Sequence, residues 1–91
     1  MKQVELKRGD LSFPALMAGE GEPVILLHGF PDCYLNWSAQ VEALAAAGYC
    51  AVAPALRGYA PSCQPADNDY SLVAAVEDVC EFAAQLGGRV H

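Results

Sequence analysis

A short apolar run that ends abruptly in a turn is the feature that most constrains the fold of this chain. Residues 24–27 read Val-Ile-Leu-Leu, and the next residues read His-Gly-Phe-Pro. An aliphatic run without polar alternation is typical of a strand that is covered on both faces, as in a parallel sheet. The sequence Gly-Glu-Gly-Glu-Pro at residues 19–23 separates this run from the preceding element. We therefore expect a buried strand over residues 24–27 with a sharp turn at its carboxyl end.

The next elements predict a strand, helix and strand crossover. A helix is expected over residues 37–47 because three apolar side chains recur at helical spacing. They are Trp37, Val41 and Leu44. Asn36 is the expected N-cap and Gly48 the expected stop. The apolar residues 49–53 form a second strand, and the lengths fit a right-handed connection between two parallel strands.

The N-terminal segment predicts an antiparallel hairpin. Residues 3–7 alternate polar and apolar side chains, and residues 11–17 form an extended run after a turn at residues 8–10. Pro14 lacks an N–H, so we expect its strand to lie near a sheet edge.

A second helix follows a loop over residues 60–69 that is rich in turn-forming residues. It is expected to bury one apolar stripe and to expose one polar stripe. The apolar stripe is Leu72, Val76, Val79, Ala83 and Leu86, and the polar stripe is Glu77, Glu81 and Gln85. Gly87 and Gly88 would end this helix, and residues 89–91 look like the start of another strand.

These elements define the expected fold class. It is α/β, a three-layer sandwich in which an antiparallel hairpin is followed by parallel strands with crossover helices. All 91 residues would belong to a single domain, of which they form the N-terminal part. Because a further parallel strand is missing, the strand over residues 24–27 would be left as an open edge, and the isolated chain is expected to aggregate or to stay partly molten.

Charge and composition exclude several classes of ligand. Five basic and eleven acidic residues give a net charge of −6, and the basic residues are scattered, so nucleic acid is not an expected partner. No segment has the length of a membrane span and the N-terminus does not resemble a signal peptide, so we expect a cytoplasmic protein without membrane contact. The oligomeric state does not follow from the sequence.

The spacing of the cysteines favours free thiols in a reducing compartment over ligands of a metal ion. Cys33, Cys50, Cys63 and Cys80 form no C-x-x-C pair, and their spacing matches no zinc motif. We expect four free thiols and no metal, with a zinc site as the alternative.

The turn after residues 24–27 is the candidate chemical site, because open α/β sheets bind ligands at the carboxyl ends of their strands. Gly29 permits close backbone approach and Pro31 fixes the exit of the turn. The N–H of Phe30 would then be free to stabilise negative charge on a substrate oxygen, and losing such a donor costs about 3 to 4 kcal/mol. We expect the His28 side chain to hold neighbouring loops by hydrogen bonds.

Several motifs together resemble the N-terminal portion of the α/β-hydrolase fold. They are His28-Gly29-Phe30-Pro31-Asp32, then Trp37 and Gln40, then Ala53-Pro54-x-x-Arg57-Gly58-Tyr59, and Ser62. The likeness is strongest to epoxide hydrolases and haloalkane dehalogenases, and it covers residues 24–70 best. It implies a strand order of 1-2-4-3-5, in which the missing neighbour is the fifth strand.

The resemblance also assigns roles to individual residues. It implies that Phe30 gives one oxyanion-hole N–H and that Pro31 is often cis. It places Asp32 and Tyr34 near the mouth of a pocket, and Trp37 and Gln40 on the first helix, with Trp37 as a third pocket residue. The motif Arg57-Gly58 is expected to be structural. The family usually has Asp and Gly where this chain has Ala55 and Ala60, so Arg57 needs other partners and is expected to order the loop after its strand.

The catalytic groups of such an enzyme are not expected within these residues. The nucleophile elbow, a later acid and a base near the C-terminus are all missing, since no serine is flanked as G-x-S-x-G and neither His28 nor His91 matches the base position. The resemblance implies a hydrolase without cofactor that acts on a small epoxide, ester or haloalkane. An epoxide hydrolase-like parent is favoured, with an inactive fragment here. A serine esterase or lipase-like hydrolase, a non-catalytic ligand-binding relative and an inactive gene product are the alternatives.

Overall fold

A four-stranded mixed sheet forms the framework of the protein. The computed structural model describes residues 1–29 and 33–91. The strands are β1 (Lys2–Arg8), β2 (Leu11–Ala18), β3 (Pro23–Ile25) and β4 (Cys50–Pro54). Their order is β1-β2-β4-β3, with antiparallel pairing of β1 with β2 and of β2 with β4, and parallel pairing of β3 with β4. The predicted hairpin, the parallel pair and the strand order are confirmed.

The prediction for Pro14 was wrong, because β2 lies inside the sheet between β1 and β4. The pairing with β4 begins at Ala15, and the Pro14 carbonyl accepts a hydrogen bond from the Ala55 N–H at 2.8 Å. In a β-strand, the N–H and the C=O of one residue point toward the same neighbouring strand. The N–H that Pro14 lacks would therefore point toward β4, at the end of the hydrogen-bonded ladder between β2 and β4. An interior strand therefore tolerates proline at the position where its pairing stops.

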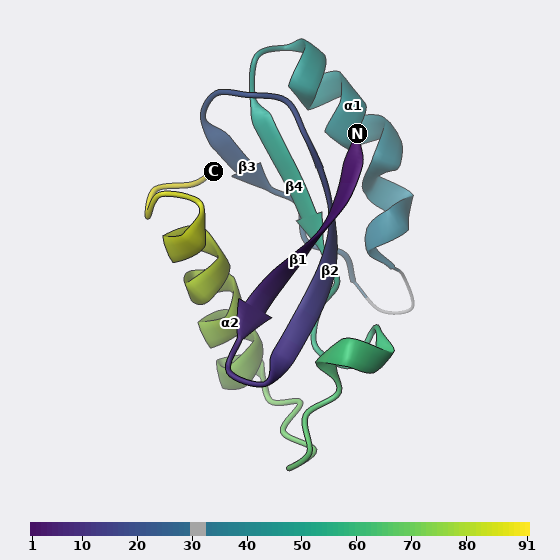
Figure 1. Ribbon diagram of the computed structural model, residues 1–91, viewed down its shortest axis with the longest axis vertical. Helices are drawn as coiled ribbons and strands as arrows, with labels where there is room; N and C mark the ends of the chain where they lie inside the picture. The colour runs from purple at the N-terminus through teal and green to yellow at the C-terminus, as the bar shows by residue number, and fades with distance from the viewer. Residues whose placement is uncertain (30–32) are drawn as a thin grey trace.

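Two α-helices lie on either side of the strands in Figure 1. They are α1 (Ser38–Ala46) and α2 (Leu72–Gln85), and short 3₁₀ helices span η1 (Tyr34–Trp37) and η2 (Pro61–Cys63). Asn36 was predicted as the N-cap of α1, but it lies within η1, which continues directly into α1. Gly48 ends α1 as expected: it has φ of +97°, and the next amide, Tyr49 N–H, bonds to the Leu44 carbonyl at 3.0 Å.

The helix α2 does not bury the stripe that its sequence predicts. Its buried residues are Ala74, Asp78 and Phe82, whereas Leu72 is 80% exposed and Val76 is 52% exposed. Phe82 packs edge-on against Phe13 of β2, with ring centroids 4.9 Å apart. Asp78 turns inward because it pairs with arginine side chains, so an ion pair and one aromatic contact set the rotation of α2.

The core lies at the centre of the sheet, where β2 and β4 contact each other. Five residues of these strands have no accessible surface: Phe13, Ala15, Ala51, Val52 and Ala53. The prediction that residues 24–27 are covered on both faces was wrong, because all of β3 is only half-buried and Leu27 is 45% exposed. The strand β3 lies at the end of the sheet, which explains this exposure.

The last residue of the chain pairs with the outer edge of β3. His91 donates its N–H to the Pro23 carbonyl at 2.9 Å and accepts from the Ile25 N–H at 2.8 Å. These two hydrogen bonds go to the residues before and after Val24, which is the pattern of parallel strands. The C-terminus accordingly lies beside β3 (Figure 1). The prediction that residues 89–91 begin a further strand agrees with this pairing.

Candidate functional site

The His28 side chain joins the segments that follow β3 and β4. The imidazole is 4% exposed, and its Nε2 accepts a hydrogen bond from the Leu56 N–H at 3.0 Å. Its Nδ1 lies 3.0 Å from the Gly29 carbonyl oxygen. The ring also packs edge-on against Tyr59, with centroids 4.5 Å apart. Both strand ends therefore meet at one histidine, as the expected role of His28 in holding loops requires.

These contacts define the proton position on His28. A neutral imidazole has one donor nitrogen and one acceptor nitrogen. Because Nε2 accepts from Leu56, the proton lies on Nδ1, which then donates to the Gly29 carbonyl. The side chain thus bonds to two backbone segments through its two ring nitrogens.

Three predicted site residues, Phe30, Pro31 and Asp32, lie outside the described residues. The oxyanion role of Phe30, the turn role of Pro31 and the pocket role of Asp32 remain predictions. What the structure describes of this turn is its entry, where Gly29 is exposed and a Cβ at Gly29 would meet nothing within 4 Å.

The structure places Tyr34 and Trp37 in the core region. Tyr34 is 9% exposed, and its hydroxyl accepts a hydrogen bond from Gln3 Nε2 at 2.9 Å. Desolvation raises the pKa of the Tyr34 hydroxyl. Trp37 packs beside the same core, and its buried indole N–H has no hydrogen-bond partner within the described part of the chain. Gln40 lies on α1 as expected. The pocket role of Tyr34 and Trp37 stays a prediction.

Arg57 is held between α2 and the loop that precedes it. Its Nε and Nη2 donate to the two carboxylate oxygens of Asp78 at 2.6 and 2.8 Å, and its Nη1 donates to the Asp69 carbonyl at 2.7 Å. The hydrogen bond to Asp78 raises the pKa of Arg57. With Ala55 where the resembled family carries Asp, Arg57 finds its carboxylate on α2 and ties the loop to that helix.

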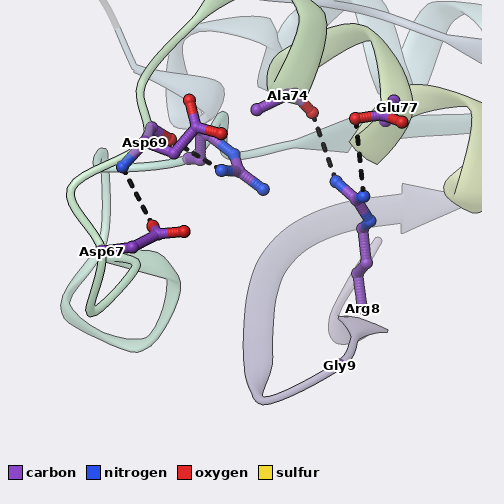
Figure 2. Close-up of a pocket in the computed structure, with 7 residues that line it drawn as sticks. Arg8, Gly9, Asp67, Asp69, Ala74 and Glu77 are labelled. Carbon is purple, nitrogen blue, oxygen red and sulfur yellow. Dashed lines mark hydrogen bonds and ion pairs between the residues drawn. The ribbon is translucent and has the colours of Figure 1, made fainter.

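Arg8 binds the same carboxylate from the hairpin. Its Nη1 donates to Asp78 Oδ1 at 2.7 Å, and this hydrogen bond raises the pKa of Arg8. Figure 2 shows Arg8 reaching from the end of β1 to Ala74 and Glu77 of α2. The polar cavity in Figure 2 holds about 280 Å³ and is lined by Arg8, Gly9, Arg57, Asp67, Asp69, Ala74 and Glu77. Its two guanidinium groups are already paired with Asp78, so the cavity is a structural ion cluster.

Asp78 is the residue that sequence reasoning missed. It is 2% exposed and binds two arginines that are 49 positions apart along the chain (57 − 8). The sequence held one signal, since Asp78 shares a helix face with Ala74 and Phe82 at spacings of four. A carboxylate on an otherwise apolar face indicates a buried ion pair.

Gly58 is required by the backbone of the loop after β4. It has φ of +89°, and a Cβ here would lie 2.6 Å from the Tyr70 ring. Its N–H donates to the Cys63 carbonyl at 2.8 Å, which closes the loop around η2. The Cys63 thiol is buried, and desolvation raises its pKa. The structural role predicted for Gly58 thus has a geometric cause.

An apolar cavity of about 300 Å³ lies beside His28. Its lining combines the end of β3, the loop after β4 and the exposed face of α2: Leu27, His28, Leu56, Leu72, Ala75, Val76, Val79 and Cys80. Within the described residues, no group of three or more His, Cys, Asp or Glu side chains could hold a metal ion, and no disulfide joins any of the four cysteines. No helix in the described segments is long and apolar enough to cross a membrane.

Comparison with known proteins identifies the family. Residues 22–89 match the family model of the alpha/beta hydrolase fold, so the chain belongs to that family. The epoxide hydrolase of Caballeronia sordidicola is 40% identical over 67 residues, which cover 74% of this chain and 20% of the relative. Epoxide hydrolase A of Mycobacterium tuberculosis is 52% identical over 75 residues, which cover 79% of this chain and 23% of the relative.

A solved structure agrees with these relatives. The epoxide hydrolase from an endophytic Streptomyces superposes with a TM-score of 0.86 at 34% identity, covering 98% of this chain and 28% of that one. The chain therefore spans between a fifth and a third of the length of these three proteins. The predicted fold class and the likeness to epoxide hydrolases are confirmed.

Proposed function

We propose that the chain is the N-terminal part of a hydrolase that opens small epoxides with water. The observation that carries the proposal is the similarity to proteins named as epoxide hydrolases, both in sequence and in fold. The His28-Gly29 turn at the carboxyl end of β3 adds to it, because ligands of open α/β sheets bind at that edge. The 91 residues form one part of a single hydrolase domain.

In this proposal the chain contributes charge stabilisation. The Phe30 N–H is one oxyanion-hole donor, Pro31 shapes the turn that presents it, and Asp32 lies near the mouth of the substrate pocket. A carboxylate nucleophile on a later elbow attacks the epoxide carbon, the ring C–O bond breaks, an acid protonates the ring oxygen and an ester intermediate forms. A base then takes a proton from water, the water oxygen attacks the ester carbonyl, and the Phe30 N–H with the amide after the nucleophile stabilises the resulting oxyanion. The bond to the alcohol then breaks, which releases the diol and restores the carboxylate.

The isolated chain is then inactive, because this mechanism needs a nucleophile, an acid and a base that lie elsewhere. A small epoxide is the substrate class, without nucleic acid, membrane or cofactor as a partner, and the protein acts in the cytoplasm.

The test is a substrate panel assayed with the complete protein that contains these residues. An aryl epoxide, a p-nitrophenyl ester and a haloalkane of similar size would be compared by kcat/KM. The proposal expects diol formation from the epoxide to exceed the other two reactions by at least about tenfold, a difference of about 1.4 kcal/mol in the barrier. Preferred ester hydrolysis would favour a serine hydrolase, and no turnover of any substrate would contradict the proposal.

A further inference from the structure

The two ends of the sheet differ in what pairs with them. The outer edge of β3 pairs with His91, whereas β1 forms the opposite end of the sheet. In an antiparallel pair, successive residues of a strand point their N–H and C=O groups alternately toward the neighbouring strand and away from it. The outer side of β1 therefore presents backbone donors and acceptors, and the register with β2 shows which residues carry them.

Glu5 points its backbone groups away from β2. It lies opposite Pro14, whose carbonyl forms its hydrogen bond on the other side of β2, toward β4. Alternation along the strand then turns the backbone groups of Gln3 and Lys7 outward as well. The Lys7 carbonyl agrees with this direction, because it accepts a hydrogen bond from the Gln85 side chain of α2 at 2.6 Å.

Gln3 and Glu5 leave their outward N–H and C=O groups available to a further strand. Within the described part of the chain, no hydrogen bond reaches these groups, and both residues are exposed. An edge strand of this kind is a template for another strand. Lys2 and Lys7 are also exposed on β1, and lysine at an edge discourages pairing with strands of unselected sequence. A partner strand must therefore match the side chains of β1.

We propose that β1 pairs antiparallel with β1 of a second copy of this chain, with the two-fold axis at Val4. This register places Gln3 opposite Glu5 of the second copy, so that the outward groups of both copies form two hydrogen-bonded pairs. The side chains also match. The Gln3 amide donates one N–H to Tyr34 and has a second N–H to give. The Glu5 carboxylate accepts from Ser12 at one oxygen and offers the other oxygen to that amide.

Other registers fit less well. Centring the pair on Glu5 would place two carboxylates directly opposite each other, and like charges in that position are destabilising. Centring it on Glu5 or on Leu6 would also need the Lys7 carbonyl, which is already bonded to α2. Centring it on Gln3 would shorten the overlap of the two strands. The register at Val4 avoids these costs, and it places two half-buried valines beside each other at the axis.

The test is the oligomeric state of the complete protein that contains these residues, measured by analytical ultracentrifugation over a concentration series. Glu5→Pro removes an outward N–H and leaves the ladder between β1 and β2 intact, and an edge strand tolerates proline at such a position. We expect Glu5→Pro to raise the dissociation constant of the dimer by at least about tenfold, because each copy loses one donor. The control is Glu5→Gln, which keeps the N–H and should change this constant by less than about threefold.

Amide hydrogen exchange provides a second measurement that needs no variant. The amides of Gln3 and Glu5 should exchange more slowly as the concentration of wild-type protein rises. Protection that is independent of concentration would indicate a partner within the same chain and would overturn the proposal. A protein that stays monomeric at submillimolar concentration, or a dimer that Glu5→Pro leaves unchanged, would overturn it as well. None of these measurements depends on catalysis, so each outcome leaves the proposed function to its own test.

Discussion

The centre of the sheet and its β3 edge contain similar aliphatic side chains but differ in how deeply these side chains are buried. In β4 the residues Ala51, Val52 and Ala53 have no accessible surface, whereas the residues of β3 are only half-buried. Neighbouring strands make the difference. β4 lies between β2 and β3, while the outer edge of β3 pairs, among residues 1–29 and 33–91, with His91. An apolar run therefore predicts a strand correctly, but the burial of that strand depends on elements that the run does not encode.

The same contrast divides the surface of α2. Phe82 and Asp78 face the hairpin and the loop after β4, while Leu72 and Val76 lie exposed beside Leu27 of the β3 edge. The exposed side of α2 and the open edge of β3 thus adjoin one another. We interpret them together as the part of the molecule that further elements of a complete domain would cover, and each prediction below tests one side of this contrast.

The largest effect is expected on the covered side, from Phe82→Ala. Phe82 is fully buried against Phe13, so removing its ring leaves a cavity and should lower the free energy of unfolding by about 3 to 5 kcal/mol in urea titrations. Val76→Ala on the exposed side is the matched control, with an expected change within about 0.5 kcal/mol. Equal losses in both variants would show that the two sides of α2 are covered alike.

A smaller loss is expected when the ion cluster is broken by Asp78→Asn. The amide keeps the shape but leaves the almost buried Arg57 without a negative partner, so we expect a loss of about 2 to 3 kcal/mol by urea titration. Glu77→Gln is the control, because Glu77 is exposed and lies 3.8 Å from Arg8, and its loss should stay below about 0.5 kcal/mol. A larger effect of Glu77→Gln would contradict the assignment of Asp78 as the centre of the cluster.

The N-cap of α2 gives the next effect. Ser71 accepts from the Ala74 N–H at 3.2 Å, and Ser71→Ala should cost about 1 kcal/mol in thermal or urea unfolding. Hydrogen bonds from the Ser71 side chain and backbone also lower the pKa of Asp69. A lowered carboxyl pKa adds stability that is present above the unfolded pKa and is lost as the pH falls through the folded one. The difference in the free energy of unfolding between the wild type and Ser71→Ala should therefore become smaller as the pH falls. A difference that grows in acid would be inconsistent with this linkage.

The double variant Leu72→Ser with Val76→Ser is expected to change the free energy of unfolding least. It is expected to change the self-association of the chain most. Both side chains are mostly exposed, so unfolding should change by less than about 0.5 kcal/mol per site. The isolated chain is expected to self-associate through its apolar α2 face and β3 edge, and the double variant should do so less in size-exclusion chromatography with light scattering. A monomeric wild-type chain with a cooperative melt would contradict the open-edge interpretation.

Much of the fold could be predicted because its signals are local. The apolar runs of β3 and β4, the glycine at residue 48 and the hairpin turn each follow from a few neighbouring residues. The rotation of α2 could not be predicted in the same way, because Asp78 meets arginines from β1 and from the loop after β4. A helical wheel ranks faces by hydropathy and assigns a lone carboxylate to water, whereas a long-range ion pair reverses that choice.

The candidate site shows the same division. The position of His28 at a strand end followed from sequence order, and its role in holding loops agrees with the hydrogen bonds to Gly29 and Leu56. Tyr34 packs in the core and its hydroxyl accepts a hydrogen bond from Gln3 of the distant strand β1, while its place near a pocket stays a prediction. The residues adjacent to a polar side chain in the sequence do not predict which distant group it will bind in the fold.

The most direct test of the central claim is to read the coding sequence for a few dozen codons beyond His91. The account predicts an open frame that reaches a nucleophile elbow, with G-x-D-x-G if the parent is an epoxide hydrolase and G-x-S-x-G if it is a serine hydrolase. The former would support the proposed reaction. A frame that stops, or that continues without either motif, would contradict the claim that these residues form the oxyanion-hole portion of an active hydrolase.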